Sequence, residues 1–269
     1  MLGLARTAQT AAWQGEPAHP NARRVGTADT NASVTWTASG GVTSTTEVKF
    51  GTASLYVAGT TDDISTTGGT RTFMDYGTGD FTQEWWQYIP TLSGHSASCD
   101  IMSNNTSGGF GIRLAGAYTS NGLSSPNPKY INIFARQQAD LDYWDITTRT
   151  GGGSWTVGQW YFCALQRKGT TMSFWLDGKL CTRSDGSGGS AASRNFASGT
   201  SIRVGTAEDA DGVGPLYIDE WCWSNTYRYT DTTADIPVPS APFTVDSYTT
   251  QLMHMDGSNG GTSFTNATS

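Results

Sequence analysis

The amino-acid sequence predicts an all-β fold, and three observations support this prediction. Only 14% of the residues are charged, whereas glycine (33 residues) and threonine (40 residues) are abundant. Leucine, glutamate and lysine, which normally fill helices, are scarce, while threonine, tryptophan and tyrosine favour strands. Turn dipeptides and glycine pairs separate short apolar runs along the chain. Many short strands divided by turns are typical of a sandwich or a barrel.

The expected strands can be placed in chain order from their residue patterns. Residues 33–37 alternate polar and apolar side chains, and 53–57 form a compact apolar run. Similar runs predict strands at 81–89, 109–114, 130–135, 142–148, 160–166, 172–176, 201–204, 215–223 and 251–256. No segment shows the pattern of a long amphipathic helix.

Two hairpins are expected in the middle of the chain. The strand at 160–166 turns through 167–170 into the next strand, which turns at Asp177-Gly178. Asp-Gly favours a type I′ turn because both central residues need positive φ.

The tryptophans predict where the core lies. Most of them are expected inside the sandwich, among them Trp85, Trp160, Trp175 and Trp221. Trp85 and Trp86 are consecutive on one strand, so their side chains point to opposite faces. One of the two must therefore meet a loop, a partner or water on the outer face.

Composition also divides the chain into parts. Residues 1–24 hold two prolines without strand periodicity, and they predict an irregular N-terminal arm. Residues 25–257 are expected to form one sandwich domain, which such a length allows. Residues 258–269 are polar and predict a C-terminal tail that cannot hold itself in place.

Charge and targeting signals exclude several partners. The formal net charge of −7 argues against nucleic acid and anionic membranes, because both require a basic face. No run approaches the roughly 18 apolar residues of a membrane span, so no membrane insertion is expected. The N-terminus lacks the apolar centre of a signal peptide, which favours assembly in a cytoplasm. The four cysteines (Cys99, Cys163, Cys181 and Cys222) lack zinc-site spacing and are expected as buried thiols.

Five motifs follow one another in the order of a known family. Residues 49–57 (KFGTASLYV), 80–86 (DFTQEWW) and 160–180, with its W…AL-x-R-x-G…LDGKL pattern, resemble the strands of laminin-G-like, concanavalin-A-like jelly rolls. The pair 202–205 (IRVG) and 217–220 (YIDE) is similar to another strand pair of that family. The last motif runs from 227–230 (YRYT) through Pro239, Asp246 and His254 to Asp256-Gly257, and it resembles laminin-G-like domains of bacteriophage virion proteins.

The resemblance implies a two-sheet antiparallel jelly-roll sandwich and a function. That function is a non-enzymatic structural protein of a phage virion, on the particle surface, with other virion proteins and further copies of this chain as partners. Head decoration or cement is favoured over a tail-fibre adhesin, since the chain has neither heptads nor a repeated β-pattern of a shaft. A glycan on the host surface is a further expected partner. The alternative is a soluble carbohydrate-binding module or a degenerate glycoside hydrolase.

One departure from the family pattern concerns the C-terminus. The stretch from Gln251 resembles the beginning of a tandem unit but stands at the end of this chain. Residues 251–256 are therefore expected either to close the sandwich as a permuted edge strand or to pair with a neighbouring subunit.

Catalytic constellations are not evident in the sequence. A glycoside hydrolase needs two carboxyl groups across a cleft, and a strand supplies them from alternating positions. Asp219 and Glu220 are adjacent, so regular alternation would send them to opposite faces, whereas Asp140 and Asp142 do alternate. There is no G-x-S-x-G elbow to accompany the three histidines, and no enzyme activity or obligatory cofactor is expected.

Two sets of residues remain as candidate sites. Aromatic rings beside polar groups favour sugar binding, and the candidates are Tyr118, Tyr143, Trp144, Asp145 and Trp155. Calcium prefers oxygen ligands from acidic loops, and the resemblance implies a calcium ion at the rim of such sandwiches. The candidate calcium ligands are Asp62, Asp63, Asp209 and Asp211.

Overall fold

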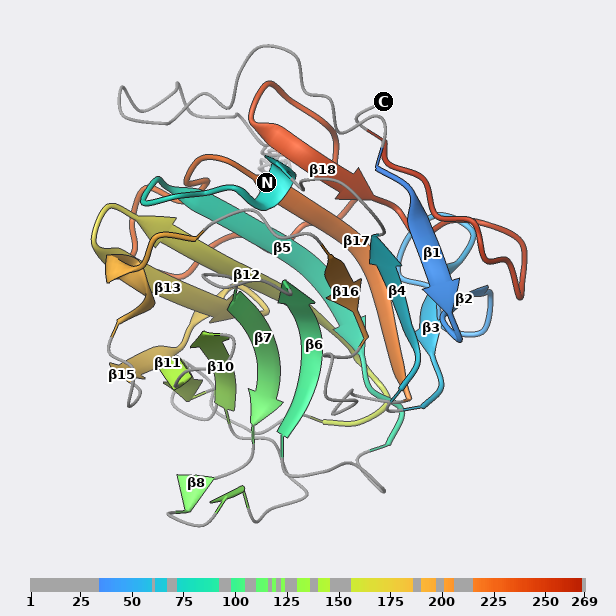
Figure 1. The fold of residues 1–269 in the computed structure, drawn as a ribbon, viewed down its shortest axis with the longest axis horizontal. Helices are drawn as coiled ribbons and strands as arrows, with labels where there is room; N and C mark the ends of the chain where they lie inside the picture. Colours follow the sequence, from blue (N-terminus) through green and yellow to red (C-terminus); the bar gives the residue numbers. More distant parts are fainter. Residues whose placement is uncertain are drawn as a thin grey trace, which may run out of the picture.

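The protein is an all-β, two-sheet antiparallel jelly-roll sandwich, as the sequence predicts (Figure 1). The computed structural model describes residues 34–59, 61–66, 72–91, 98–104, 110–115, 118–119, 122–123, 130–135, 140–145, 156–185, 190–196, 201–205 and 215–267. The expected arm at 1–24 lies outside these residues. No helix among the described residues is long and apolar enough to cross a membrane.

One sheet, called here the front sheet, lies nearer the viewer in Figure 1. Its strand order is β1 (Trp36–Ser39), β4 (Asp63–Thr66), β16 (Ile202–Val204), β6 (Ser98–Asn104), β7 (Phe110–Ala115), β10 (Tyr130–Ala135), β11 (Asp140–Asp145) and β15 (Thr182–Asp185). A separate two-stranded sheet pairs β8 (Tyr118–Thr119) with β9 (Gly122–Leu123).

The second sheet, called the back sheet, has the order β14 (Lys179–Leu180), β13 (Thr171–Leu176), β12 (Trp160–Lys168), β5 (Phe81–Tyr88), β17 (Leu216–Ser224), β3 (Ser54–Val57) and β2 (Val42–Ser44). The last strand, β18 (Thr249–Met253), pairs with β17 beside this path. Both predicted hairpins are confirmed, since β12, β13 and β14 pair in succession. Asp177 and Gly178 have φ of 49° and 73°, as a type I′ turn requires.

The core between the sheets is built from stacked indole rings. Trp221 lies 5.0 Å from Trp85 and 5.2 Å from Trp223, with nearly parallel planes in both pairs. Trp144 of β11 meets Phe174 of β13 at 6.1 Å and so joins the front sheet to the back sheet. Each such aromatic pair adds about 0.5–1.5 kcal/mol beyond the area that it buries.

A buried arginine ties two loops to the same core. Arg167 donates through Nε to the carbonyl of Gly79 (2.6 Å) and through its two terminal nitrogens to Gly77 and Arg194 (both 2.8 Å). Its guanidinium also lies between the rings of Phe81 and Phe196. Burial lowers the pKa of Arg167 to about 10, so the group is still charged at neutral pH. The arginine of the W…AL-x-R-x-G motif therefore has a structural role.

The C-terminal segment corrects one expectation and decides between two others. β18 pairs with β17 of the same chain, so this segment closes its own sandwich. The tail expected to be unsupported is docked through residue 267, because Thr43 exchanges backbone hydrogen bonds with Gly260 and Gly261. Phe264 is buried in the core, and the segment after it bonds to Leu252 of β18 through the N–H of Ala267 and the side chain of Asn266. In Figure 1 the red segment passes beside β1 and β2.

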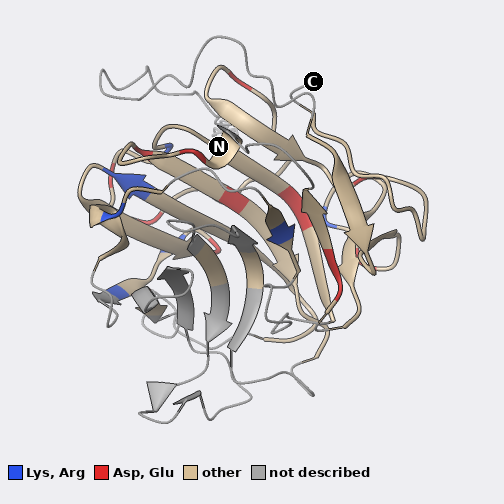
Figure 2. Ribbon diagram, in the orientation of Figure 1, with Lys and Arg blue, Asp and Glu red and all other residues tan. Residues whose placement is uncertain are grey.

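Charged groups are few in the described part of the chain. Figure 2 shows acidic positions within β4, β5 and β17, where most side chains are buried. Such positions need partners, because a buried charge without one is costly.

Candidate functional site

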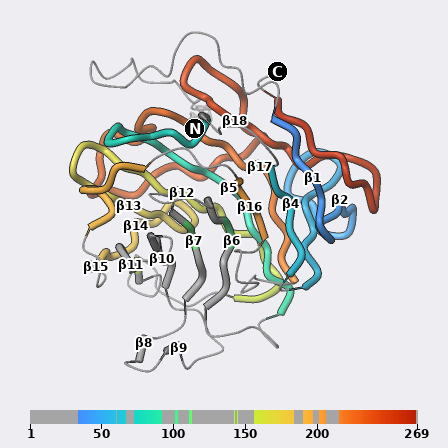
Figure 3. The backbone as a smooth tube through the Cα atoms, in the orientation of Figure 1, coloured from blue at the N-terminus to red at the C-terminus, as the bar shows by residue number. Residues whose placement is uncertain are grey.

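The residues of the sequence motifs meet on the outer face of the back sheet, which turns away from the core. This face is covered by residues 225–248, called the strap, which can be followed in Figure 3 between β17 and β18. Trp175 donates its indole N–H to the carbonyl of Ala234 (2.8 Å), and Ile236 donates to the carbonyl of Gly178 (2.8 Å). Beneath the strap lies a second, smaller apolar cluster of Trp86, Phe162, Ala164, Trp175 and Tyr229.

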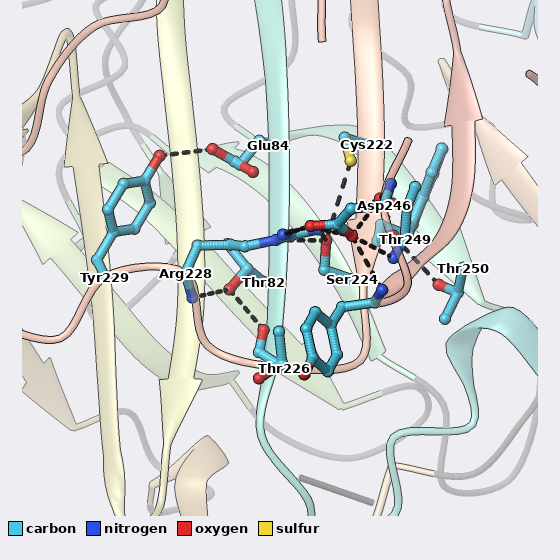
Figure 4. Close-up of polar contacts among 12 residues, drawn as sticks. Thr82, Glu84, Cys222, Ser224, Thr226, Arg228, Tyr229, Asp246, Thr249 and Thr250 are labelled. Atoms are coloured by element: carbon cyan, nitrogen blue, oxygen red, sulfur yellow. Dashed lines mark hydrogen bonds and ion pairs between the residues drawn. The ribbon is translucent and has the colours of Figure 1, made fainter. Parts of the chain in front are cut away.

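Arg228 fixes the two ends of the strap to each other (Figure 4). Its guanidinium forms a two-nitrogen ion pair with Asp246 and donates to the hydroxyls of Ser224 (2.7 Å) and Thr249 (3.2 Å). Burial alone would lower the pKa of Arg228, but the hydrogen bonds to Asp246 and the charges of the neighbouring acidic groups together outweigh burial and raise it. The same contact lowers the pKa of Asp246, so the pair is charged at neutral pH.

Glu84 lies next to Arg228 on the same face, as Figure 4 shows. Its carboxylate accepts a hydrogen bond of 2.5 Å from the hydroxyl of Tyr229. Burial raises the pKa of Glu84, although the charge of Arg228 opposes this shift. Gln166 also holds the start of the strap, since its side-chain oxygen accepts the backbone N–H groups of Arg228 and Tyr229 (both 2.8 Å).

A β-bulge in β17 corrects the expected orientation of the two adjacent acids. The pairing with β5 jumps from Asp219 opposite Trp86 to Cys222 opposite Glu84, which inserts one residue, and Glu220 has φ of 54°. Ile218 and Trp221 both lie in the core, so Asp219 and Glu220 both turn to the outer face. The extra residue breaks the alternation on which the sequence prediction depends.

Asp219 and Glu220 hold different segments. Asp219 accepts the backbone N–H groups of Lys49 (3.0 Å) and Phe50 (3.1 Å), and burial raises its pKa to about 8. Glu220 accepts the N–H of Phe243 in the strap (2.8 Å) and contacts Nδ1 of His254 at 2.7 Å. The hydrogen bond to Glu220 raises the pKa of His254.

Asp256 holds the residues that follow the KFG motif. Its Oδ1 accepts the backbone N–H of Thr52 (2.5 Å) and of Ala53 (3.2 Å). Gly51 has φ of +67°, and a Cβ there would lie 2.3 Å from the same carboxylate oxygen. Only glycine fits both this backbone conformation and this close approach.

These hydrogen bonds give the carboxylates of the outer face a structural role. Asp219, Glu220 and Asp256 all accept backbone N–H groups, and they connect loops, strap and β18 to the sheet. A carboxylate that is committed in this way is not positioned as a general acid or a nucleophile, since it faces the chain rather than a cleft.

We predict that the protein is less stable in alkali. Asp219 retains its proton in the folded state up to about pH 8, whereas its unfolded value is 3.8, so stability falls as the pH rises between these values. The raised pKa of His254 acts in the same direction, because its stabilising contact is lost when the imidazolium deprotonates. The free energy of unfolding should fall by about 3–5 kcal/mol between about pH 5 and about pH 9.

Chemical denaturation across this pH range tests the prediction. Asp219→Asn retains an acceptor oxygen but cannot ionise, so it should remove most of the slope. Asp235→Asn is the matched control, because the pKa of Asp235 is lowered by its hydrogen bond to Lys179 and it titrates below this range. A slope that Asp219→Asn leaves unchanged would refute the assignment.

The structure corrects one proposed sugar-binding residue. Trp144 is 0% exposed and packs in the core, so it cannot stack on a ligand. The alternation of β11 explains this, since Asp142 and Trp144 share one face. Tyr118, Tyr143 and Asp145 lie in strands, but their side chains are outside the described part of the structure, as is the whole of Trp155.

Asp142, an alternative catalytic acid, has a structural role as well. It is 0% exposed, pairs with Nε of Arg183 at 2.8 Å and accepts the backbone N–H of Ala191 (2.8 Å). It thereby holds the short 3-10 helix η3 (Ala191–Ser193) against β11.

Of the four proposed calcium ligands, the structure describes Asp62 and Asp63. Asp63 is buried and ion-paired with Arg203 at 3.0 Å, while Asp62 accepts the N–H of Gly59 (2.9 Å). Asp209 and Asp211 lie outside the described residues. In the part of the chain that the structure describes, no three His, Cys, Asp or Glu side chains gather where a metal ion could bind.

No protein-family model matches the chain, and no curated protein matches it either. Among solved structures, a putative carbohydrate binding protein from Bacteroides ovatus is similar, with 15% identity and a TM-score of 0.47 over 87% of this chain and 56% of that one. The binding domain of botulinum neurotoxin serotype D is similar at 12% identity and a TM-score of 0.46, over 72% of this chain and 44% of that one.

A third similar structure is the heptameric SAP-like pentraxin from Limulus polyphemus, with 12% identity and a TM-score of 0.43 over 72% of this chain and 77% of that one. The chain spans about half the length of the first two structures. The jelly-roll assignment rests on the strand pairing of this chain itself.

Proposed function

We propose that the protein is a non-catalytic structural protein on the surface of a bacteriophage particle, and that it binds glycan. One observation carries the proposal: the residues that produce the resemblance to phage laminin-G-like domains are partners of one another. Asp219 holds the KFG motif, Asp256 holds the residues after it, and Arg228 pairs with Asp246. Contacts between motif residues that are far apart in the sequence favour a true relationship to these domains over a chance match of short motifs.

The contacts of the buried acidic side chains support the non-catalytic part of the proposal. Asp142, Asp219 and Glu220 each accept backbone N–H groups, so they hold the fold together. If a hydrolase activity is present instead, incubation with polysaccharides will release reducing sugar, and Asp142→Asn will abolish that release. Sugar release would refute the proposal.

The place of the protein on the particle can be tested by cryo-electron microscopy of the phage. We expect copies on the head surface, as head decoration or cement, in contact with other virion proteins. Copies at the tail tip alone would refute decoration in favour of an adhesin. Light scattering of the purified protein should show a homo-oligomer, and a monomer at all concentrations would contradict that part of the proposal.

Calcium binding remains a separate prediction. Asp62 together with Asp209 and Asp211 would supply oxygen ligands, while Asp63 is engaged by Arg203. Added calcium should raise the melting temperature, and Asp209→Asn should remove the effect. A calorimetric titration without heat, together with an unchanged melting temperature, would contradict the prediction.

A further inference from the structure

A row of aromatic rings crosses the back sheet on its outer face. Tyr56, Tyr217, Tyr88 and Trp160, called here the aromatic row, lie directly opposite one another on β3, β17, β5 and β12. Neighbouring strands are about 4.8 Å apart, so the row spans about 14 Å across the strands. No single-strand motif reveals it, because each strand contributes one ring.

The rings of the aromatic row touch in sequence. Ring centroids are 4.6 Å apart for Tyr56 and Tyr217, 5.7 Å for Tyr217 and Tyr88, and 5.6 Å for Tyr88 and Trp160. The planes are tilted or perpendicular to one another, so the row is a continuous ridge rather than a flat floor. Such contacts hold the rings in place before any ligand arrives, which lowers the entropy cost of binding.

The cover of the outer face ends before the aromatic row. Two residues further along the strands, Trp86 is only 3% exposed beneath Phe50 and the ammonium of Lys49. By contrast Tyr56, Tyr88 and Trp160 are partly exposed, and only Tyr217 between them is buried. The prediction that Trp160 is a core residue is therefore wrong: it stands on this ridge, at the margin of the second cluster.

Polar groups border the aromatic row. The hydroxyl of Tyr88 donates to Oε1 of Glu47 (3.1 Å). The amine of Lys49 lies 3.8 Å from the ring of Trp86, which directs that cation to the covered part of the face. The border thus offers hydroxyl groups and one carboxylate, a set that suits sugar hydroxyls and repels anionic groups.

We propose that the aromatic row is a binding site for an extended, uncharged polysaccharide that lies across the four strands. The inference rests on the proposed glycan-binding function and names its site and ligand class. Aromatic side chains with a polar tip suit ligands that have one apolar face and many hydroxyls. A ridge of this length contacts several consecutive sugars, so a polymer should bind more tightly than a single sugar.

Affinity electrophoresis in gels that contain a soluble polysaccharide tests the proposal. The neutral probes are hydroxyethyl cellulose and galactomannan, and the anionic probe is alginate. The wild-type protein should be retarded by at least one neutral polymer and not by alginate. Tyr56→Ala and Trp160→Ala should each weaken the retardation by about tenfold, which is the effect of about 1.4 kcal/mol of lost contact.

Two controls separate loss of the site from loss of the fold. Tyr248→Ala removes a partly exposed tyrosine from the strap, away from the aromatic row, and should leave retardation unchanged. The milder Tyr88→Phe removes only the hydroxyl that meets Glu47 and should weaken binding without lowering the melting temperature. Binding should also change the tryptophan fluorescence of the wild type, and Trp160→Phe should reduce this signal.

The outcomes distinguish failure of this inference from failure of the proposed glycan-binding function. Retardation that survives Tyr56→Ala and Trp160→Ala would overturn the aromatic row as the site but leave glycan binding intact. Retardation by alginate alone would overturn the ligand class. Failure to bind any glycan on an array would overturn both, and a row-dependent dimer without sugar binding would assign the ridge to a second copy of this chain.

Discussion

Replacing Arg228 with alanine should lower the free energy of unfolding by about 3–5 kcal/mol, because it leaves the buried Glu84 and the partly buried Asp246 without their counter-charge. Arg228 is the partner of Asp246 and the nearest cation to Glu84 (Figure 4). The loss corresponds to a fall in melting temperature of roughly 10 °C for a chain of this size. The strap should also become accessible to protease, since its two ends are no longer tied together.

The control for this prediction is an exposed ion pair on the same sheet. Lys179 and Asp235 are 2.7 Å apart, but their side chains are 43% and 39% exposed. Lys179→Ala should therefore cost much less than Arg228→Ala. If Arg228→Ala does not fold, Asp246→Asn keeps the size of the partner and should still lower stability. Equal losses in the exposed and buried pairs would contradict the assignment.

Replacing Arg167 with alanine should have an effect of similar size for a different reason. The change removes three hydrogen bonds of a charged group, to the carbonyl oxygens of Gly77, Gly79 and Arg194, and each such bond contributes about 1.5–3 kcal/mol. Urea denaturation measures the loss. We expect at least about 3 kcal/mol, with unfolding still in one transition.

Arg167→Lys tests the geometry of that contact. A lysine keeps the charge, but its compact ammonium cannot reach three carbonyls on two loops, so it should rescue little of the lost stability. Arg167→Met fills the volume without any donor and separates packing from hydrogen bonding. A lysine variant as stable as the wild type would show that the charge alone matters.

Most of the back sheet could be predicted from the sequence. Strands β5, β12, β13 and β17 are long and apolar, so their patterns stand out from the surrounding turns. The front sheet was predicted less completely. Its strands β4, β6 and β15 are short or rich in polar residues, so their alternation is weak, and the same holds for β2 at the edge of the back sheet.

The candidate site was less predictable than the fold. Regular alternation predicts opposite faces for Asp219 and Glu220, because a one-residue bulge leaves no clear mark in a single sequence. Trp144 was expected at a ligand rim because polar residues surround it, yet its inward position places it in the core. The aromatic row was missed because it exists only across strands.

The sequence by itself determined that this chain forms layered, antiparallel strands with indole rings between them, since residue preference and alternation are local properties. Tertiary structure alone decided which side chains share a face. Strand register, the bulge at Glu220 and the path of the strap depend on contacts between residues far apart in the sequence, such as Lys49 and Asp219, which are 170 positions apart. Such contacts form only when the sheets assemble, because the free energy of burial is shared among all the strands that pack together.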